Sequence, residues 1–212
     1  MTDQYAVIGN PISHSQSPLI HSEFAKQTGQ NIVYDRLSAP LDGFDRVASA
    51  FVGQGGKGLN ITLPFKGDAF RLAHQLTSRA SVCEAVNTLT FKDGVIYGDN
   101  TDGVGLVRDI VENLDMPIAG KRVLLLGAGG AVRGVLLPLL EEKPASLTVA
   151  NRTVEKAQAL ASQFAPYGAV RAVGYPDLMG EQFDIIINGT STSLHDELPP
   201  IPHGVFAPDA LA

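Results

Sequence analysis

A strand that runs straight into a glycine loop and then a helix is the feature that most restricts the fold of this chain. Arg122–Leu126 is a continuous apolar run, Gly127-Ala128-Gly129-Gly130 follows it, and the segment from Ala131 to Glu142 has helical spacing. Glycines there permit a tight turn and close backbone approach, and the first N–H groups of the helix can hold an anion. This order predicts a doubly wound domain that binds a dinucleotide, although Val132 replaces the third glycine of the usual fingerprint. The alternative is a tight turn that holds no ligand.

Strands and helices alternate on both sides of this motif, which is typical of mostly parallel sheets covered by helices. We expect strands at 5–9, 32–37, 58–62, 87–91, 95–97, 122–126, 147–150, 169–173 and 184–187, and helices at 17–26, 41–52, 64–74, 102–114, 131–142 and 153–164. The predicted fold class is α/β, with an N-terminal α/β domain at 1–102, a linking helix at 103–119 and a Rossmann-type dinucleotide-binding domain at 120–212.

The end of the chain carries a separate prediction. The residues after Asn188 have the character of a loop with several prolines, and only four strands are expected after Gly120. We therefore expect the Rossmann-type domain to be incomplete at its C-terminus, with Asp184–Ile187 as an exposed apolar edge. Such an edge favours a homodimer or aggregation, and we expect the chain as given to be weakly active or inactive.

Composition excludes several classes of partner. Hydrophobic residues make up 44% of the 212 residues, so the chain can bury a core. A net charge of −6 without a basic cluster argues against nucleic acid and anionic membranes, and we expect neither a membrane span nor a signal peptide. Cys83 is the only cysteine and the five histidines lack metal-ligand spacing, so we expect no metal and a reducing, cytoplasmic location.

The residues after the second strand of the glycine-loop domain indicate which dinucleotide is bound. NAD sites usually carry a carboxylate there for the ribose 2′-hydroxyl, whereas this chain has Asn151-Arg152-Thr153. Arg152 can hold a 2′-phosphate in a planar fork, and Thr153 can cap the next helix. The segment favours NADP(H), unless Arg152 is a solvated surface arginine.

Short neutral polar side chains gather in the first half of the chain. Ser15 and Ser17 are two residues apart, as are Asn60 and Thr62, and Asn87 lies in an apolar run where its amide needs a partner. Such groups suit a polyol or a carboxylate. For Ser17 the alternative is a helix N-cap.

The positions of two charged residues, Lys66 and Asp102, allow both a functional and a structural interpretation. Lys66 lies in the first turn of an expected helix, where a cation opposes the helix dipole. That position suits either a functional lysine or a side chain that extends into water. Asp102 begins another expected helix, where an N-cap role is the alternative.

Seven blocks of this sequence, in order and across the whole chain, resemble the shikimate dehydrogenase family. The blocks are Gly9–Pro18, Asn60–Lys66, Ala85–Thr88, Gly98–Gly103, Gly127–Ala131, Asn151–Thr153 and Asn188–Ser191. The resemblance implies reversible NADP-dependent reduction of 3-dehydroshikimate to shikimate, in aromatic amino-acid biosynthesis. Two alternatives remain: a variant that uses quinate or has relaxed cofactor use, and an inactive ligand-binding fragment, because family members are longer at the C-terminus.

The resemblance also implies roles for individual residues. Lys66 and Asp102 match the catalytic pair, which also contacts substrate, with Lys66 acting on the developing alkoxide and Asp102 orienting it. The remaining substrate contacts correspond to Ser15, Ser17, Asn60, Thr62 and Asn87. The cofactor contacts correspond to Gly127, Ala128, Gly129, Gly130, Ala131, Asn151, Arg152, Thr153, Lys156, Asn188 and Thr190. Lys156 stands where many members have a second arginine.

Overall fold

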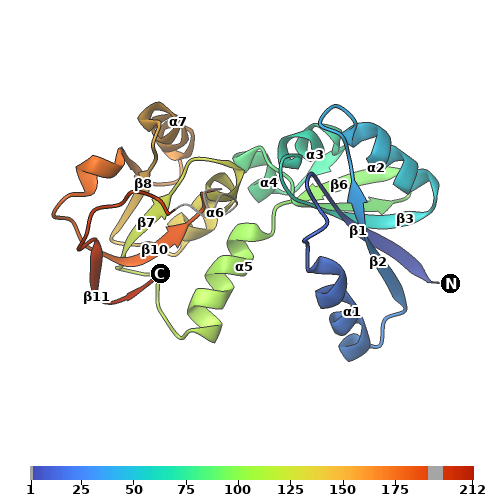
Figure 1. Cartoon of the computed structure of the whole chain (residues 1–212), viewed down its shortest axis with the longest axis horizontal. Coiled ribbons are helices and arrows are strands. Elements are labelled where there is room, and N and C mark those ends of the chain that lie inside the picture. The colour runs from blue at the N-terminus through green and yellow to red at the C-terminus, as the bar shows by residue number, and fades with distance from the viewer. Residues whose placement is uncertain (1, 191–197) are drawn as a thin grey trace. The chain divides into compact units, whose positions relative to one another are not determined.

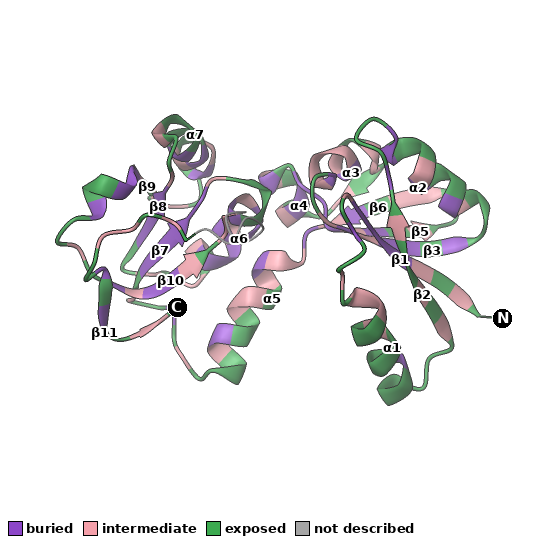
Figure 2. Ribbon diagram, in the orientation of Figure 1, coloured by how far each residue is buried: buried purple, intermediate pink, exposed green. Residues whose placement is uncertain are grey.

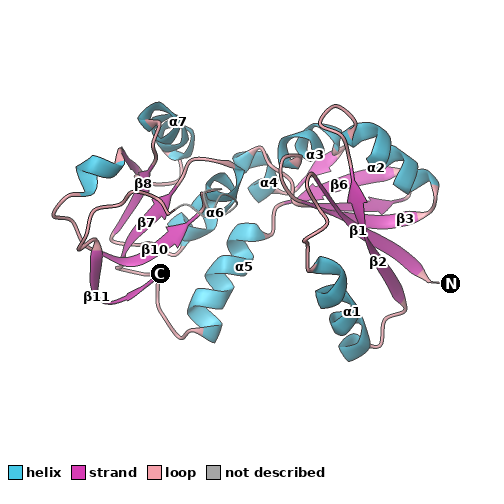
Figure 3. Cartoon of the chain, in the orientation of Figure 1, coloured by secondary structure: helices cyan, strands magenta, loops and turns pink. Residues whose placement is uncertain are grey.

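The computed structural model describes residues 2–190 and 198–212, which form two compact units, Met1–Thr101 and Asp102–Ala212 (Figure 1). Each unit contains one β-sheet with helices packed on it, as the secondary-structure colouring shows (Figure 3). The predicted α/β fold class is therefore confirmed.

The sheet of the first unit has the strand order β2-β1-β3-β5-β6-β4. Its β1, β2 and β3 are parallel, whereas β5 runs antiparallel to both β3 and β6. The expected hairpin joins β5 to β6 through Asp93 and Gly94, whose φ angles of 52° and 74° suit a tight two-residue turn. The strands are β1 (Asp3–Gly9), β2 (Ile32–Ser38), β3 (Gly56–Ile61), β4 (Gln75–Leu76), β5 (Thr88–Lys92) and β6 (Val95–Asp99). The helices are α1 (Ser17–Thr28), α2 (Phe44–Gly53), α3 (Lys66–Leu72) and α4 (Ser78–Cys83).

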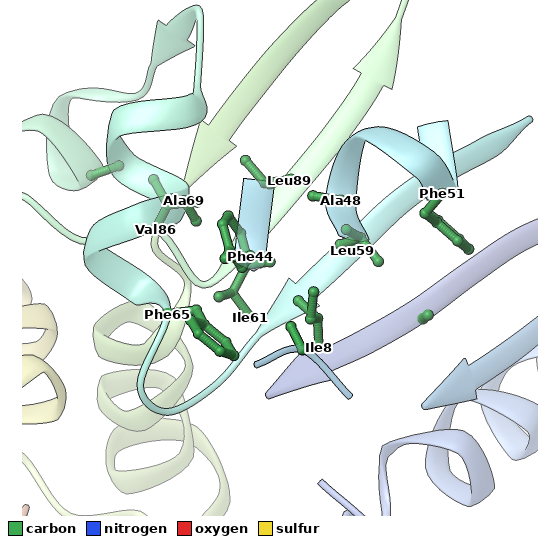
Figure 4. Close-up of a cluster of buried hydrophobic side chains, with 13 residues drawn as sticks. Ile8, Phe44, Ala48, Phe51, Leu59, Ile61, Phe65, Ala69, Val86 and Leu89 are labelled. Atoms are coloured by element: carbon green, nitrogen blue, oxygen red, sulfur yellow. The ribbon is translucent and has the colours of Figure 1, made fainter. Parts of the chain in front are cut away.

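The core of the first unit anchors the turn that precedes α3. Phe65 is fully buried, and its ring lies 5.3 Å from the ring of Phe44 on α2 (Figure 4). The Phe65 N–H donates to the carbonyl of Thr62 at 3.0 Å, so residues 62–65 form a turn. The helix expected from Pro64 consequently begins at Lys66.

The sheet of the second unit is parallel throughout, with the order β11-β10-β7-β8-β9. Its central strands β7 and β8 are buried except for their first residues (Figure 2), which explains their apolar sequences. The strands are β7 (Arg122–Leu126), β8 (Ser146–Ala150), β9 (Arg171–Val173), β10 (Phe183–Asn188) and β11 (Phe206–Leu211). The helices are α5 (Asp102–Arg108), a π-helical turn (Asp109–Asn113), α6 (Gly130–Glu141), α7 (Val154–Phe164) and a 3-10 turn (Tyr175–Leu178).

Strand β11 corrects the expectation of four strands and a bare sheet edge. It pairs with β10 on the side away from β7, so β10 lies inside the sheet and Ile185 is fully buried. The sequence concealed this strand because Pro208 lies within it, and proline is tolerated only at sheet edges. The expected apolar edge at Asp184–Ile187 was therefore wrong.

Helix α5 packs closely against α6 within the second unit. A Cβ atom at Gly103 would lie 2.5 Å from the carbonyl oxygen of Gly134 and 2.7 Å from the Cγ of Pro138. Helix α6 continues through Pro138, which is buried in this contact. The start of α5 thus depends on a glycine that no larger residue can replace without displacing α6.

We predict that Gly103→Ala lowers the free energy of unfolding by about 1–3 kcal/mol, the usual cost of overpacking. Gly105→Ala is the matched control on the same helix, because its Cβ would meet no described atom within 4 Å. That control should be neutral or stabilising, by about 0.4–1 kcal/mol. Urea denaturation measures both, and equal effects would contradict the packing argument.

Candidate active site

The polar residues of the first unit gather where the parallel strands β1 and β3 end. The loop after β1 carries Ser15 and leads to Ser17, Asn60 lies in β3, and Thr62 follows β3 directly. The two strand ends approach closely, since a Cβ at Gly9 would lie 2.5 Å from Cγ2 of Thr62. Ligands of parallel sheets bind beyond the carboxyl ends of the strands, and these side chains lie at that edge.

The serine pair is held by its own hydrogen bonds and by Arg36. The Ser15 hydroxyl lies 3.1 Å from the Ser17 hydroxyl and accepts from the Ser17 N–H at 3.3 Å. The Arg36 guanidinium donates to the Ser15 carbonyl at 2.6 and 2.8 Å. The N-cap of α1 is Gln16, and Ser17 is the first helical residue, so the N-cap alternative for Ser17 was wrong.

Asn87 is almost fully buried, and its amide has the partners that burial requires. Its Oδ1 accepts from the N–H of Thr101 at 3.0 Å and from the hydroxyl of Thr88 at 2.9 Å. Its Nδ2 donates to the Thr101 hydroxyl at 3.1 Å. Asn87 therefore fixes Thr101, the residue immediately before Asp102, whatever else it contacts.

Asn60 connects this cluster to a tyrosine that the sequence analysis did not select. Its Nδ2 donates to the Thr88 hydroxyl at 3.3 Å, and its Oδ1 accepts from the Tyr34 hydroxyl at 2.6 Å. Tyr34 lies on β2, two residues from Arg36, so both side chains point to the same side of the sheet. That spacing was the available sequence signal for Tyr34.

Lys66 and Asp102 each begin a helix, and each is half-buried. The carbonyl of Lys66 accepts from the Val86 N–H at 2.9 Å, which connects the start of α3 to the residue before Asn87. Asp102 is the first residue of α5, where its negative charge suits the helix dipole. Lys66 belongs to the first unit and Asp102 opens the second.

The glycine loop of the second unit lies at a change of direction in the sheet order. The chain adds β8 and β9 on one side of β7 and then β10 on the other, and such a switch point is where dinucleotides bind. Gly127 has a φ of +104°, and its Cβ would lie 3.1 Å from the carbonyl oxygen of Gly189. This position therefore requires glycine for both its conformation and its close contact.

The next two glycines leave room for a ligand. A Cβ at Gly129 or Gly130 would meet no described atom within 4 Å. Gly129 is the N-cap of α6 and has no side chain to satisfy the first N–H groups of the helix, which include that of Ala131. Ala128 lies between the turn and this helix start. The loop thus fits a pyrophosphate that accepts from the helix N–H groups.

The segment after β8 presents two cations at the same end of the sheet. Arg152 and Lys156 are both exposed, and the Asn151 amide donates to the Thr153 carbonyl at 2.8 Å to shape the turn. Thr153 is the N-cap of α7, as predicted, but its side chain makes no capping bond to the described residues. Its hydroxyl is therefore compatible with a ligand contact.

Arg152 also lines a cavity of about 710 Å³. Tyr175 in this cavity has a pKa raised by burial, an effect that the positive charge of Arg152 partly offsets. The other lining residues come from α7, from the segment after β9 and from that before β11, and they are Val154, Gly174, Pro176, Asp177, Met179, Pro200, Ile201 and Pro202. The mostly apolar lining suits an apolar group of a ligand, and Arg152 suits an anion attached to that group.

The segment after β10 lies against the glycine loop. The Gly189 N–H donates to the Leu126 carbonyl at 2.9 Å, at the point where β7 ends. The N–H and hydroxyl of Thr190 both donate to Oδ1 of Asn188, at 3.0 and 2.6 Å. Ser191 of the same sequence block, like His195, lies outside the described residues.

Residues 2–190 and 198–212 contain no group of three or more His, Cys, Asp or Glu placed to hold a metal ion. Over the same ranges, every helix is too short or too polar to cross a membrane.

Comparison with known proteins identifies the family. Residues 7–89 match the family model of the shikimate dehydrogenase substrate binding domain, and residues 106–195 match that of shikimate / quinate 5-dehydrogenase. The shikimate dehydrogenase (NADP(+)) of Chromobacterium violaceum is 72% identical over 100% of this chain and 78% of its own length. That of Laribacter hongkongensis is 66% identical, over 98% of this chain and 76% of its own length.

A solved structure agrees with these matches. Shikimate 5-dehydrogenase from Thermus thermophilus, in complex with NADP(H) and shikimate, superposes with a TM-score of 0.85 and 30% identity. The match covers 97% of this chain and 75% of that one. An N-terminal α/β unit that matches a substrate-binding domain, followed by a Rossmann-like unit, is the arrangement of a dehydrogenase with separate substrate and cofactor domains. This chain belongs to the shikimate dehydrogenase family.

We predict that Gly129→Ala weakens NADP binding by about tenfold or more without changing the melting temperature, because its Cβ enters only the space left for the pyrophosphate. Gly127→Ala is the contrasting variant. It should lower the melting temperature, because alanine is strained at a φ of +104°. Thermal denaturation and NADP titration separate these effects, and unchanged NADP affinity in Gly129→Ala would contradict this site.

Proposed function

We propose that this chain catalyses the reversible NADP-dependent reduction of 3-dehydroshikimate to shikimate, a step of aromatic amino-acid biosynthesis. The observation that carries the proposal is the turn after β8, where Arg152 and Lys156 stand in place of the carboxylate of an NAD site. The curated relatives with high identity are named NADP-dependent shikimate dehydrogenases. A spectrophotometric NADPH assay with 3-dehydroshikimate tests it.

The cofactor contacts that we propose are all in the second unit. The N–H groups of Gly129, Gly130 and Ala131 hold the pyrophosphate, and Arg152 and Lys156 hold the 2′-phosphate. When bound, NADPH supplies the hydride. The remaining contacts are proposed for Gly127, Ala128, Asn151, Thr153, Asn188 and Thr190.

The substrate contacts that we propose are in the first unit, apart from Asp102. Ser15 and Ser17 take the carboxylate, and Asn60, Thr62 and Asn87 take hydroxyl groups of the ring. Lys66 delivers a proton or a positive charge to the oxygen where alkoxide character develops, and Asp102 hydrogen-bonds the same group and orients Lys66. Such a group acts on the transition state more than on the bound substrate.

Three further parts of the proposal concern the partners, the cellular location and the oligomeric state of the protein. The small-molecule substrate is the proposed partner, and nucleic acid and membrane are not. A cytoplasmic location is supported by a single, buried cysteine, Cys83. The sequence analysis expected a homodimer because it expected an exposed edge at β10. Strand β11 covers that edge, so this reason no longer holds, and size-exclusion chromatography tests the homodimer. The expected weak turnover stays a prediction for the NADPH assay.

We predict that Arg152→Ala weakens NADP binding by about tenfold or more and leaves NAD binding nearly unchanged. The lost contact is a charge-assisted hydrogen bond worth about 1.5–3 kcal/mol. Arg108→Ala on α5 is a control for removing an exposed arginine of the same unit. Equal losses for both cofactors would mean that Arg152 acts on the fold or the pyrophosphate.

We predict that Lys66→Ala lowers kcat by about 10²–10⁴-fold with a smaller change in KM, as expected for a positioned proton donor. Asp102→Asn should also lower kcat, and the two effects should be far from additive because the residues act as one unit. Steady-state kinetics of the single and double variants measures this. An unchanged kcat in Lys66→Ala would remove the catalytic assignment.

The variant that uses quinate or NAD is distinguished by the same assay. Comparison of kcat/KM for the four pairs of shikimate or quinate with NADP or NAD decides between them. We expect shikimate with NADP to have the highest value, because the serine pair suits the substrate carboxylate and Arg152 suits the 2′-phosphate.

A further inference from the structure

The proposed site for the substrate carboxylate is built from neutral hydroxyl groups. The hydroxyls of Ser15 and Ser17 lie 3.1 Å apart, and the Ser17 N–H donates to Ser15 Oγ at 3.3 Å. Hydrogen bonds from a neutral donor hold an anion less strongly than those from a charged donor. A carboxylate bound by these two serines would therefore be stabilised by a positive charge nearby.

The start of α1 supplies only part of such a charge. Ser17 is the first helical residue, so the positive end of the helix dipole lies at the serine pair. Pro18 follows it and has no N–H group, which removes one of the donors of the first turn. A full positive charge requires a basic side chain.

Arg36 is a cation in direct contact with this segment. It lies on β2, at the edge of the first sheet, and two of its guanidinium nitrogens donate to the Ser15 carbonyl, at 2.8 and 2.6 Å. The Ser15 N–H donates to the carbonyl of Ile12 at 3.1 Å, so the backbone of Ser15 is held at both of its polar groups. The guanidinium is thus fixed against the residue whose hydroxyl we propose to bind the carboxylate.

The charge of Arg36 is not neutralised by an acidic side chain. In the part of the chain that the structure describes, 2–190 and 198–212, the ion pairs involve other basic residues. Asp35 precedes Arg36 on β2, but successive residues of a strand point to opposite faces of the sheet. The Ser15 carbonyl carries no formal charge. Arg36 therefore keeps its positive charge for a nearby anion.

Covalent geometry limits the distance between this charge and the serine hydroxyl. The carbonyl oxygen and the hydroxyl of one serine are at most about 5 Å apart. The nearer guanidinium nitrogen lies 2.6 Å from that carbonyl oxygen. It is therefore within about 8 Å of Ser15 Oγ, which is about one Debye length at physiological salt. At low salt, a charge at this distance changes the affinity for an anion by about three- to tenfold.

We propose that Arg36 is a specificity-determining residue for the substrate carboxylate: its charge attracts the carboxylate that Ser15 and Ser17 bind, and its hydrogen bonds hold the Ser15 backbone. The inference rests on the proposed function, because it takes the serine pair as the carboxylate site. It adds the source of the positive charge that the serines lack. Arg36 takes no part in the transfer of the hydride or the proton.

The test is Arg36→Gln, which removes the charge and keeps an N–H donor. We expect the dissociation constant for shikimate, measured by isothermal titration calorimetry in about 20 mM NaCl, to rise by about three- to tenfold. In about 1 M NaCl, where the Debye length is about 3 Å, the variant and the wild type should differ by less than about twofold. The melting temperature should stay unchanged, because Arg36 is exposed.

Steady-state kinetics gives a second measurement. At low salt the KM for shikimate should rise in parallel with the dissociation constant, while kcat changes by less than about twofold. The carboxylate keeps its charge throughout the reaction, so Arg36 stabilises the bound substrate and the transition state equally. A residue that aligned the reacting groups would lower kcat instead.

Two further variants separate the local charge from the alternatives. Arg36→Lys keeps a cation at the same position, so its affinity for shikimate at low salt should stay within about twofold of that of the wild type. Arg46→Gln is the matched control, because it removes an exposed arginine of α2 and changes the net charge of the same unit equally. This control should leave the affinity for shikimate unchanged.

Four results would overturn the inference, and each has its own signature. Equal shikimate affinity of the wild type and Arg36→Gln at low salt removes Arg36 from recognition while the proposed function stands. A loss that is independent of salt and is not restored in Arg36→Lys leaves Arg36 only the role of holding the Ser15 backbone. An equal loss in Arg46→Gln assigns the effect to net charge. If the wild type neither binds nor oxidises shikimate, the proposed function fails and the inference fails with it.

Discussion

The second unit depends on a close backbone contact where β7 and β10 end. Gly127 adopts a left-handed φ there, and a Cβ at this position would lie only 3.1 Å from the carbonyl oxygen of Gly189, so a side chain would be both strained and crowded. Helix α6 starts directly after this turn, and no side chain among the described residues caps its first N–H groups. The shape of the glycine loop thus follows from a backbone constraint, and under the proposed function the cations after β8 add selectivity for NADP.

The first unit follows a different principle, in which candidate ligand-binding side chains also satisfy one another. Oδ1 of Asn87 accepts from Thr88 and Thr101, and Ser15 accepts the Ser17 N–H. No described buried side-chain nitrogen or oxygen lacks a hydrogen-bond partner. Hydrogen bonds of this kind preorganise a site, since its polar groups are oriented before any ligand binds.

Sequence reasoning succeeded where the signal was local and failed where it depended on partners. The glycine loop, the strands around it and the hairpin at Asp93 and Gly94 are encoded in adjacent residues, so their predictions agree with the structure. Strand β11 was missed because its pairing to β10 outweighs the proline within it. Tyr34 was missed for a related reason: its hydrogen bond joins it to Asn60, which lies 26 residues away in the sequence and which only the folded sheet brings close.

The contact between α5 and α6 has a consequence for how the proposed reactive groups are carried. Gly103 fixes the start of α5 to Gly134, one turn beyond the glycine loop on the helix that begins at Gly130. Asp102 therefore belongs to the same compact unit as the glycine loop, whereas Lys66 belongs to the unit that carries Ser15 and Ser17. Under the proposed function, the unit that binds the cofactor carries one member of the reactive pair and the unit that binds the substrate carries the other, so neither unit by itself holds the complete pair.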